Sequence, residues 1–217
     1  MKNLVVTGII NNINRFYDYD DTKINEIRYG IESLYLTITK TIIIFIISFL
    51  LNITKELMLL FVFYSLIRLT GFGVHAKKSW HCWVTSLTTF VLIPLLIKYI
   101  TLSKVAIIIG YSICIPLLMI YAPSDTEKRP LINKKKRIVY KTITTIIAIS
   151  YLIYSLVQSN TMIINTLFLS VLLETLLILP CTYKLFGVKY NNYKNYKKKG
   201  GQIWNYLLLL QLQLEHS

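Results

Sequence analysis

Apolar residues along the chain fall into blocks that are separated by short polar and basic segments. A helix needs about 20 apolar residues to cross the hydrocarbon core of a bilayer. The blocks approach this length, so the pattern predicts an all-α, polytopic integral membrane protein with about six transmembrane helices. The predicted spans cover residues 33–53, 56–70, 83–100, 103–121, 139–158 and 162–183.

The first 31 residues follow a different pattern, in which apolar positions recur at helical spacing between polar ones. One such series runs from Leu4 to Phe16, and a second follows an aspartate-rich segment and includes Ile24, Ile27 and Ile31. We therefore predict N-terminal amphipathic helices lying in the membrane interface, and no cleavable signal peptide. The membrane domain is assigned to residues 1–190, and residues 191–217 to a basic tail whose closing LEHS resembles an appended remnant.

Prolines and ionisable side chains also occur inside the predicted spans. Membrane helices tolerate prolines such as Pro94, Pro116 and Pro180, and bend at them. Lys40 and Glu174 are less usual, because ionisable groups within a span are expected to be paired or functional. The sequence does not identify the partner of either group.

Charge changes the interpretation of the loops. The net charge of +14 would suggest nucleic-acid binding in a soluble protein. Here the positive side chains lie between apolar blocks, so we expect a lipid bilayer as partner and no nucleic acid. If the N-terminus is cytoplasmic, only Lys55, Lys98 and Lys104 lie outside, Lys40 and Lys141 fall within spans, and the other Lys and Arg residues face the cytoplasm. This asymmetry predicts a cell-membrane protein with both termini in the cytoplasm.

One polar segment, RLTGFGVHAKKSWHCWV from Arg68 to Val84, carries candidate chemistry. A catalytic cysteine needs a base or a cation to form its thiolate. His75 and Cys82 are seven residues apart, which on a straight helix is about 10.5 Å along the axis. That exceeds the reach of proton transfer. The chain must therefore fold back between them, and Gly71 and Gly73 favour a turn just before the histidine.

The simplest arrangement places His75 on a loop and Cys82 in the first turn of the next helix, whose N-terminus would lower the pKa of the thiol. His81 is the poorer base on a helix, because adjacent side chains point about 100° apart, although this argument fails in a loop. Two other interpretations stay open. The side chains could lie in the membrane interface without taking part in chemistry, or they could bind zinc. The lack of a nearby carboxylate or second cysteine argues against a zinc site.

The group that would orient the base stays open. Arg68, Ser79 and Asp125 are candidates to orient the histidine or to polarise a carbonyl. Arg68 could equally be a charge at a helix end that extends toward the membrane surface.

Three segments together resemble a known family. They are GVHAKKSWHC, in which a Gly-x-His-Ala motif precedes the cysteine, YAPSDTEKRPLINKKKR, and ILPCTYKLF. The chain resembles the accessory gene regulator B (AgrB) peptidases of Gram-positive quorum sensing over residues 1–190. It departs from the pattern at Phe72-Gly73, where many members have paired glycines. The resemblance implies a membrane cysteine endopeptidase with His75 and Cys82 as its catalytic pair. Arg68 and Gly73 are candidates for orienting or oxyanion support.

The resemblance also implies the substrate, a small precursor peptide similar to AgrD. Cys82 would release the C-terminal segment of the precursor and hold the remainder as a thioester. An internal thiol or hydroxyl would then displace Cys82 to give a cyclic thiolactone or lactone. No cofactor or metal is implied, and a homodimer is compatible with the family.

The acidic tail of such a precursor is expected to meet basic side chains, although topology already explains the same charges. These residues are Lys77, Lys78, Lys128, Arg129, Lys134 and Lys135. Two alternatives stay open: a non-enzymatic small membrane transporter or scaffold, and a membrane protease that hydrolyses the precursor without cyclising it.

Overall fold

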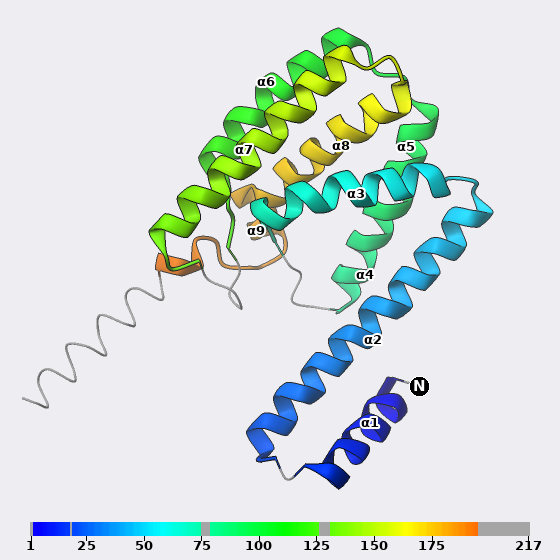
Figure 1. The fold of residues 1–217 in the computed structure, drawn as a ribbon, viewed down its shortest axis with the longest axis vertical. Helices are drawn as coiled ribbons and strands as arrows, with labels where there is room; N and C mark the ends of the chain where they lie inside the picture. The colour runs from blue at the N-terminus through cyan, green and yellow to red at the C-terminus, as the bar shows by residue number, and fades with distance from the viewer. Residues whose placement is uncertain (1, 18, 75–78, 126–130, 195–217) are drawn as a thin grey trace, which may run out of the picture. The chain divides into compact units, whose positions relative to one another are not determined.

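The computed structural model describes residues 2–17, 19–74, 79–125 and 131–194 (Figure 1). In these ranges the regular structure is helical, apart from one isolated backbone bridge between Phe72 and Ser124. The prediction of an all-α fold is therefore confirmed. The chain divides into two compact units, Met1–Thr54 and Lys55–Ser217.

The first unit is a pair of helices, α1 (Lys2–Phe16) and α2 (Asp21–Leu50). The buried side chains of Val6 and Ile10 lie on α1, which packs against α2. The Asp20 side chain caps α2 by accepting a hydrogen bond from the Lys23 N–H at 3.2 Å. The second predicted amphipathic segment is not a separate helix, because this cap begins one continuous helix that runs on through residues 33–50 of the first predicted span.

The second unit contains the other helices. They are α3 (Thr54–Gly71), α4 (Ser79–Leu87), a π-helical turn η1 (Thr88–Leu92), α5 (Ile93–Tyr99), α6 (Lys104–Tyr121), α7 (Lys134–Val157), α8 (Thr161–Ile178) and α9 (Pro180–Leu185). Helices α6, α7 and α8 pack side by side (Figure 1). Helix α8 is the most enclosed, since Leu167, Val171 and Ile178 are completely buried in the apolar core.

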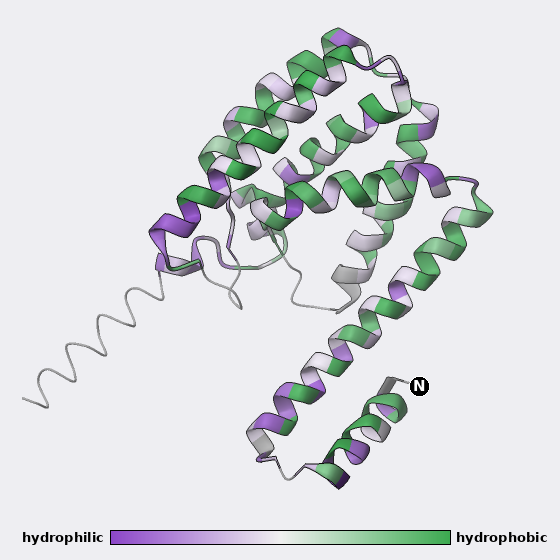
Figure 2. Ribbon diagram, in the orientation of Figure 1, coloured by the Kyte–Doolittle hydropathy of each residue, from purple (hydrophilic) through white to green (hydrophobic). Residues whose placement is uncertain are grey.

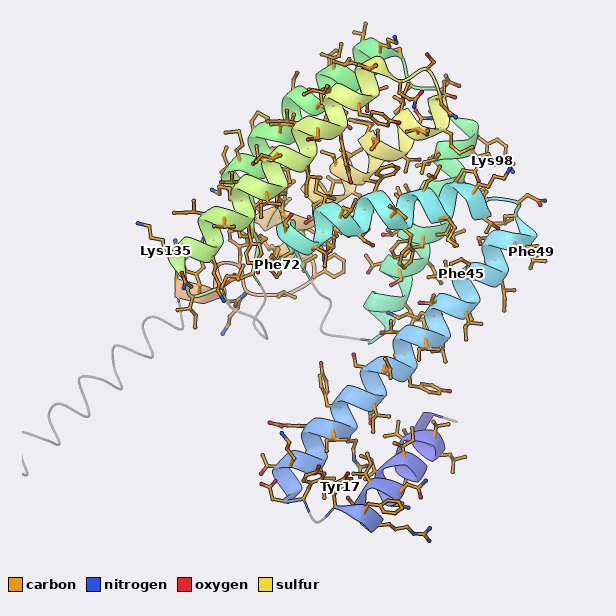
Figure 3. All side chains as sticks on the ribbon, viewed as in Figure 1. Tyr17, Phe45, Phe49, Phe72, Lys98 and Lys135 are labelled. Carbon is orange, nitrogen blue, oxygen red and sulfur yellow. The ribbon has the colours of Figure 1, made fainter. Side chains whose placement is uncertain are left out.

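Four helices in the described ranges are long and apolar enough to cross a membrane. They are Thr22–Leu50, Lys104–Tyr121, Lys134–Val157 and Thr161–Ile178. Figure 2 shows that these helices are mostly apolar, and α2, α6 and α7 expose apolar side chains along their length. Phe49 on α2, labelled in Figure 3, is 75% exposed. A bilayer would cover such surfaces, so the fold is that of a membrane protein.

The expectation of about six spans is not confirmed. Helix α3 has the length, but it carries the charged residues Lys55, Glu56 and Arg68. The apolar run Trp83–Tyr99 is shorter than 18 residues, and its helix contains the π-helical turn η1.

The prolines have different effects. Pro116 lies inside α6 without ending it, as expected in a membrane helix. The sequence suggested that one helix continues to residue 183 and bends at Pro180. The structure shows instead that the helix ends before this proline. Leu179 adopts an extended backbone (φ −65°, ψ 141°), so α8 ends at Ile178 and Pro180 begins α9. Proline restricts the preceding residue in this way and suits the first turn of a helix.

Candidate functional site

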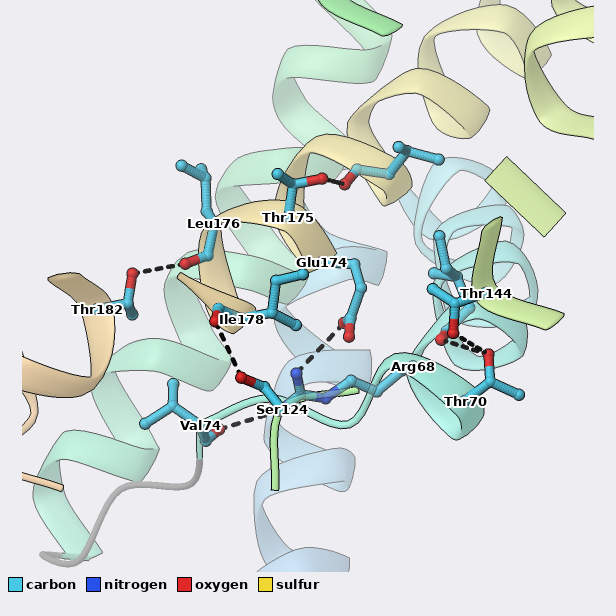
Figure 4. A network of polar contacts seen from close by, with 12 residues as sticks. Arg68, Thr70, Val74, Ser124, Thr144, Glu174, Thr175, Leu176, Ile178 and Thr182 are labelled. Carbon is cyan, nitrogen blue, oxygen red and sulfur yellow. Dashed lines mark hydrogen bonds and ion pairs between the residues drawn. The ribbon is translucent and has the colours of Figure 1, made fainter. Parts of the chain in front are cut away.

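The predicted catalytic segment is described only in part. Cys82 is the fourth residue of α4, which begins at Ser79, so it lies in the first turn of that helix as expected. His75, Lys77, Lys78, Lys128 and Arg129 lie outside the described residues. The structure describes the chain up to Val74, and this approach to His75 is held by an extensive polar network (Figure 4).

Arg68 is the centre of this network. It lies in the last turn of α3, and its Nη1 donates a hydrogen bond to Oε2 of Glu174 on α8 at 3.2 Å. Its Nη2 donates to the carbonyl oxygen of Val74 at 3.0 Å. One guanidinium group therefore joins two helices to the residue that precedes His75. This arrangement excludes the interpretation of Arg68 as a charge that simply extends to the membrane surface.

The two glycines before His75 have separate roles. A Cβ atom at Gly71 would overlap with the carboxylate of Glu174, and a Cβ atom at Gly73 would overlap with the guanidinium group of Arg68. Gly73 also has a φ of +96°, which side chains disfavour. This positive φ agrees with the conformational freedom that the sequence analysis expected of Gly73. The expected fold-back between His75 and Cys82 involves residues 75–78, which lie outside the described residues. Gly71 ends α3 and makes room for the ion pair.

The backbone of residues 72–74 is fixed from two sides. The Gly73 N–H donates to the Ser124 carbonyl at 2.9 Å, and the Ser124 N–H donates to the Gly71 carbonyl at 3.0 Å. On the other side, the Val74 N–H donates to the Leu177 carbonyl at 3.1 Å. The Ser124 hydroxyl donates to the Ile178 carbonyl at 3.0 Å. The loop after α6 and the end of α8 thus enclose the approach to His75.

Asp125 stabilises the surrounding chain. Its carboxylate accepts hydrogen bonds from the backbone N–H groups of Asn192 at 3.0 Å, Tyr193 at 2.8 Å and Leu131 at 3.4 Å. Burial raises the pKa of the Asp125 carboxyl group, whereas these N–H groups and the charge of Arg137 lower it. The contacts give this residue a role in joining loops.

Positive charge gathers where α7 begins. Lys134 and Lys135 are exposed in its first turn, and Figure 3 labels Lys135. The guanidinium carbon of Arg137 lies 3.4 Å from the centre of the Tyr193 ring. Cations at a helix N-terminus are disfavoured by the helix dipole. The lysines in the first turn of α7 are therefore exposed to solvent and do not stabilise the helix.

Sequence reasoning missed that Glu174 pairs with Arg68. The signal was present, because a buried charge in a span calls for a partner, but spacing along one chain does not identify it. Contacts between α3 and α8 supply that information. No three His, Cys, Asp or Glu side chains gather as a metal site in the described ranges.

Comparison with known proteins gives a consistent match. The sequence profile of the family described as accessory gene regulator B matches residues 5–178. An AgrB-like protein of Clostridium acetobutylicum is 30% identical over 186 residues, which are 86% of this chain and 89% of that protein. The accessory gene regulator protein B of Staphylococcus aureus is 27% identical over 183 residues, or 80% of this chain and 95% of that protein. No solved structure matches the chain.

Proposed function

The chain belongs to the accessory gene regulator B (AgrB) family of quorum sensing, and on that premise we propose that it is a membrane cysteine endopeptidase. Its substrate is a small AgrD-like precursor peptide. The peptidase domain spans residues 1–190, including the N-terminal amphipathic segment 1–31. A basic tail follows over residues 191–217. Both termini and the catalytic pair face the cytoplasm.

The reaction begins with proton transfer from the Cys82 thiol to the imidazole of His75. The thiolate attacks a peptide carbonyl of the precursor, and the peptide C–N bond breaks. His75 returns the proton to the departing amine, so the C-terminal segment leaves and the remainder stays bound to Cys82 as a thioester. An internal thiol or hydroxyl then attacks this thioester, loses its proton and releases Cys82. The product is a cyclic thiolactone or lactone.

Cyclisation has to compete with water. A thioester is close in free energy to the thiolactone that replaces it, whereas hydrolysis is strongly downhill. The enzyme must therefore hold the internal nucleophile beside the thioester, where a high effective concentration accelerates the exchange, and must keep water away from the site. A catalytic segment at the membrane surface suits both requirements.

The observation that carries the proposal is the position of Arg68. Its guanidinium group binds the carbonyl of Val74, one residue before His75, and thereby fixes the chain that leads to the proposed base. Gly73 supports the same geometry, because only a residue without a Cβ atom leaves room for Arg68 at this point. A chain with no chemistry at His75 would have little reason to hold its approach so closely.

The test is to co-express the chain with an AgrD-like precursor and to follow the precursor by mass spectrometry. We expect cleavage in the parent protein and its loss in both Cys82→Ser and His75→Ala. The matched controls are Cys181→Ser, whose thiol is exposed on α9, and His81→Ala, and both should retain cleavage. A product lighter by one water than the linear fragment identifies cyclisation.

The membrane level of every variant is measured by immunoblot. Cleavage that survives both Cys82→Ser and His75→Ala would exclude this mechanism. Loss of activity in His81→Ala with activity retained in His75→Ala would transfer the role of base to the neighbouring histidine.

A further inference from the structure

The side chain of Glu174 is completely buried, and the function proposed above does not use it. Its Oε2 atom accepts the hydrogen bond from Arg68 at 3.2 Å. Within the described part of the chain, its Oε1 atom has no hydrogen-bond partner. A buried carboxylate with an unused oxygen is costly, since burial removes both charges of the pair from water. The pair is therefore poorly explained as a means of stabilising the helix bundle.

The geometry of the pair indicates what it supplies instead. The Arg68 side chain is 20% exposed, whereas that of Glu174 is 0% exposed, so Glu174 is the inner and fixed end of the pair. It holds one arm of the guanidinium group, and the other arm binds the Val74 carbonyl. Figure 4 shows Arg68 between these two acceptors. Gly71 and Gly73 leave the space that both groups occupy.

We propose that Glu174 is a positioning residue, which acts through Arg68 on the backbone at Val74 and so sets the geometry of the His75–Cys82 pair. This inference rests on the proposed function. It makes a specific claim about α8, a helix that contributes no residue to the proposed catalytic pair. If Glu174 no longer holds Arg68, the guanidinium group can turn away from Val74, and the base loses its alignment with the thiol.

Three variants separate this role from a structural one. Glu174→Gln keeps the shape and one acceptor oxygen but removes the charge. Glu174→Asp keeps the charge, but its side chain is shorter by one methylene, so the carboxylate lies farther from Arg68. Arg68→Lys keeps the positive charge and replaces the planar fork with a single ammonium group, which does not reproduce both contacts. The matched control is Ser170→Ala, because the buried Ser170 hydroxyl on the same helix donates to the Thr166 carbonyl one turn earlier and to no other group among the described residues.

The first readout is precursor cleavage by purified protein in lipid nanodiscs. Misalignment of about 1 Å can reduce a rate about 100-fold. We therefore expect Glu174→Gln and Arg68→Lys to lower kcat about tenfold or more with little change in KM. Glu174→Asp should recover part of the rate, and Ser170→Ala should match the parent protein. Membrane level and thermal unfolding report on folding.

The second readout needs no precursor. In a background with Cys114→Ser and Cys181→Ser, the rate at which iodoacetamide alkylates Cys82 is measured against pH. A free thiol has a pKa of about 8.5, and a paired histidine extends the reaction to lower pH. We expect this low-pH reaction in the parent background, its loss in His75→Ala, and a shift toward the ordinary thiol profile in Glu174→Gln.

The outcomes are distinguishable. A parent background that already shows the ordinary thiol profile contradicts the proposed His75–Cys82 pair itself. Glu174→Gln and Arg68→Lys proteins with parental kcat and an unchanged alkylation profile would overturn the positioning role alone. Failure of all three variants to accumulate in the membrane would overturn it as well, because the pair would then serve folding.

Discussion

At Phe72 the backbone enters the left-handed region, with a φ of 62°. This conformation costs an L-residue with a side chain roughly 1–2 kcal/mol. The ring recovers part of that cost by packing edge-on against Tyr140, at 5.2 Å between ring centres. Phe72 thus occupies a place where glycine has the lower backbone energy.

This balance predicts an unusual order of stabilities. Phe72→Ala loses the ring but keeps the unfavourable φ, whereas Phe72→Gly loses the ring and relieves the backbone. We expect Phe72→Gly to unfold at higher temperature than Phe72→Ala in detergent, with a difference of about 1 kcal/mol in the free energy of unfolding.

The control for that comparison is Leu69, which is 70% exposed within α3. At a helical position the order should reverse, with Leu69→Gly less stable than Leu69→Ala by about 1 kcal/mol. The same order of glycine and alanine at both positions would contradict the strain at Phe72.

The structural role of a single residue was predictable from the sequence where one local rule determines its conformation or position. The place of Cys82 in a first helical turn followed from the reach of proton transfer, and the expected freedom of the backbone at Gly73 is seen in its positive φ. The partner of Glu174 did not, because Arg68 is separated from it by 106 residues. A pair of that kind depends on which helices pack together, and hydrophobic periodicity leaves this choice open.

Among the elements, the backbone N–H groups of Asn192 and Tyr193 are bound by the Asp125 carboxylate from the loop after α6. Hydrogen bonds to a charged acceptor contribute about 1.5–3 kcal/mol each. We therefore expect Asp125→Ala to accelerate amide hydrogen exchange at Asn192 and Tyr193 by about tenfold or more. Mass spectrometry of peptides covering residues 188–194 measures this change.

The matched control is Asp20→Ala, which removes the same type of bond from the start of α2 in the other unit. Exchange should accelerate there, with residues 188–194 unaffected. Unchanged exchange at Asn192 and Tyr193 in Asp125→Ala would show that other contacts hold this segment.

The first turn of α7 permits a second prediction at this scale. Replacing Lys128, Arg129, Lys134 and Lys135 by glutamine should raise KM for an acidic precursor severalfold and weaken the dependence of KM on salt. The same change should leave the stability of α7 equal or slightly higher, because the replacement of Lys134 and Lys135 removes cations from the N-terminus of this helix. Cleavage kinetics at increasing salt and thermal unfolding separate the two effects.

Lys104 provides the control. It is the first residue of α6, as Lys134 is the first residue of α7, but it is predicted to lie on the opposite side of the membrane. Lys104→Gln should not change KM. An unchanged KM in the four-residue variant, with normal membrane insertion, would leave topology as the sufficient explanation of this charge.

The boundaries of elements were less predictable than their existence. Most apolar blocks became helices, because length and hydropathy determine them. The cap at Asp20 and the extended Leu179 before Pro180 moved the boundaries. Local side-chain and backbone contacts set these points, and a hydropathy pattern averages over them.

At the scale of the whole molecule, the second unit has two ends, and its positive charge gathers at one of them. Asn165 donates hydrogen bonds to the carbonyls of Ile97 and Ile100, so the start of α8 lies beside the end of α5. At the other end of α8, the Leu177 and Ile178 carbonyls bind Val74 and Ser124. Arg68 lies at this second end, where it binds Val74, and Arg137 lies over the Tyr193 ring beside Asp125. Lys134, Lys135 and Lys136 directly precede Arg137 at the start of α7, and Lys184 lies in α9, which follows α8.

We expect the positively charged end to face the cytoplasm, because positive charge at the ends of membrane helices is retained there. In a background with Cys82, Cys114 and Cys181 replaced by serine, Ser103→Cys and Ser159→Cys should react with a membrane-impermeant maleimide on intact cells. Both residues lie in connections at the less charged end, before α6 and before α8. Asn133→Cys, at the cap of α7, should react only after the membrane is permeabilised. Labelling of Asn133→Cys on intact cells, with Ser103→Cys protected, would invert the topology. It would then place the approach to His75 on the outer face, where a cytoplasmic precursor does not reach it.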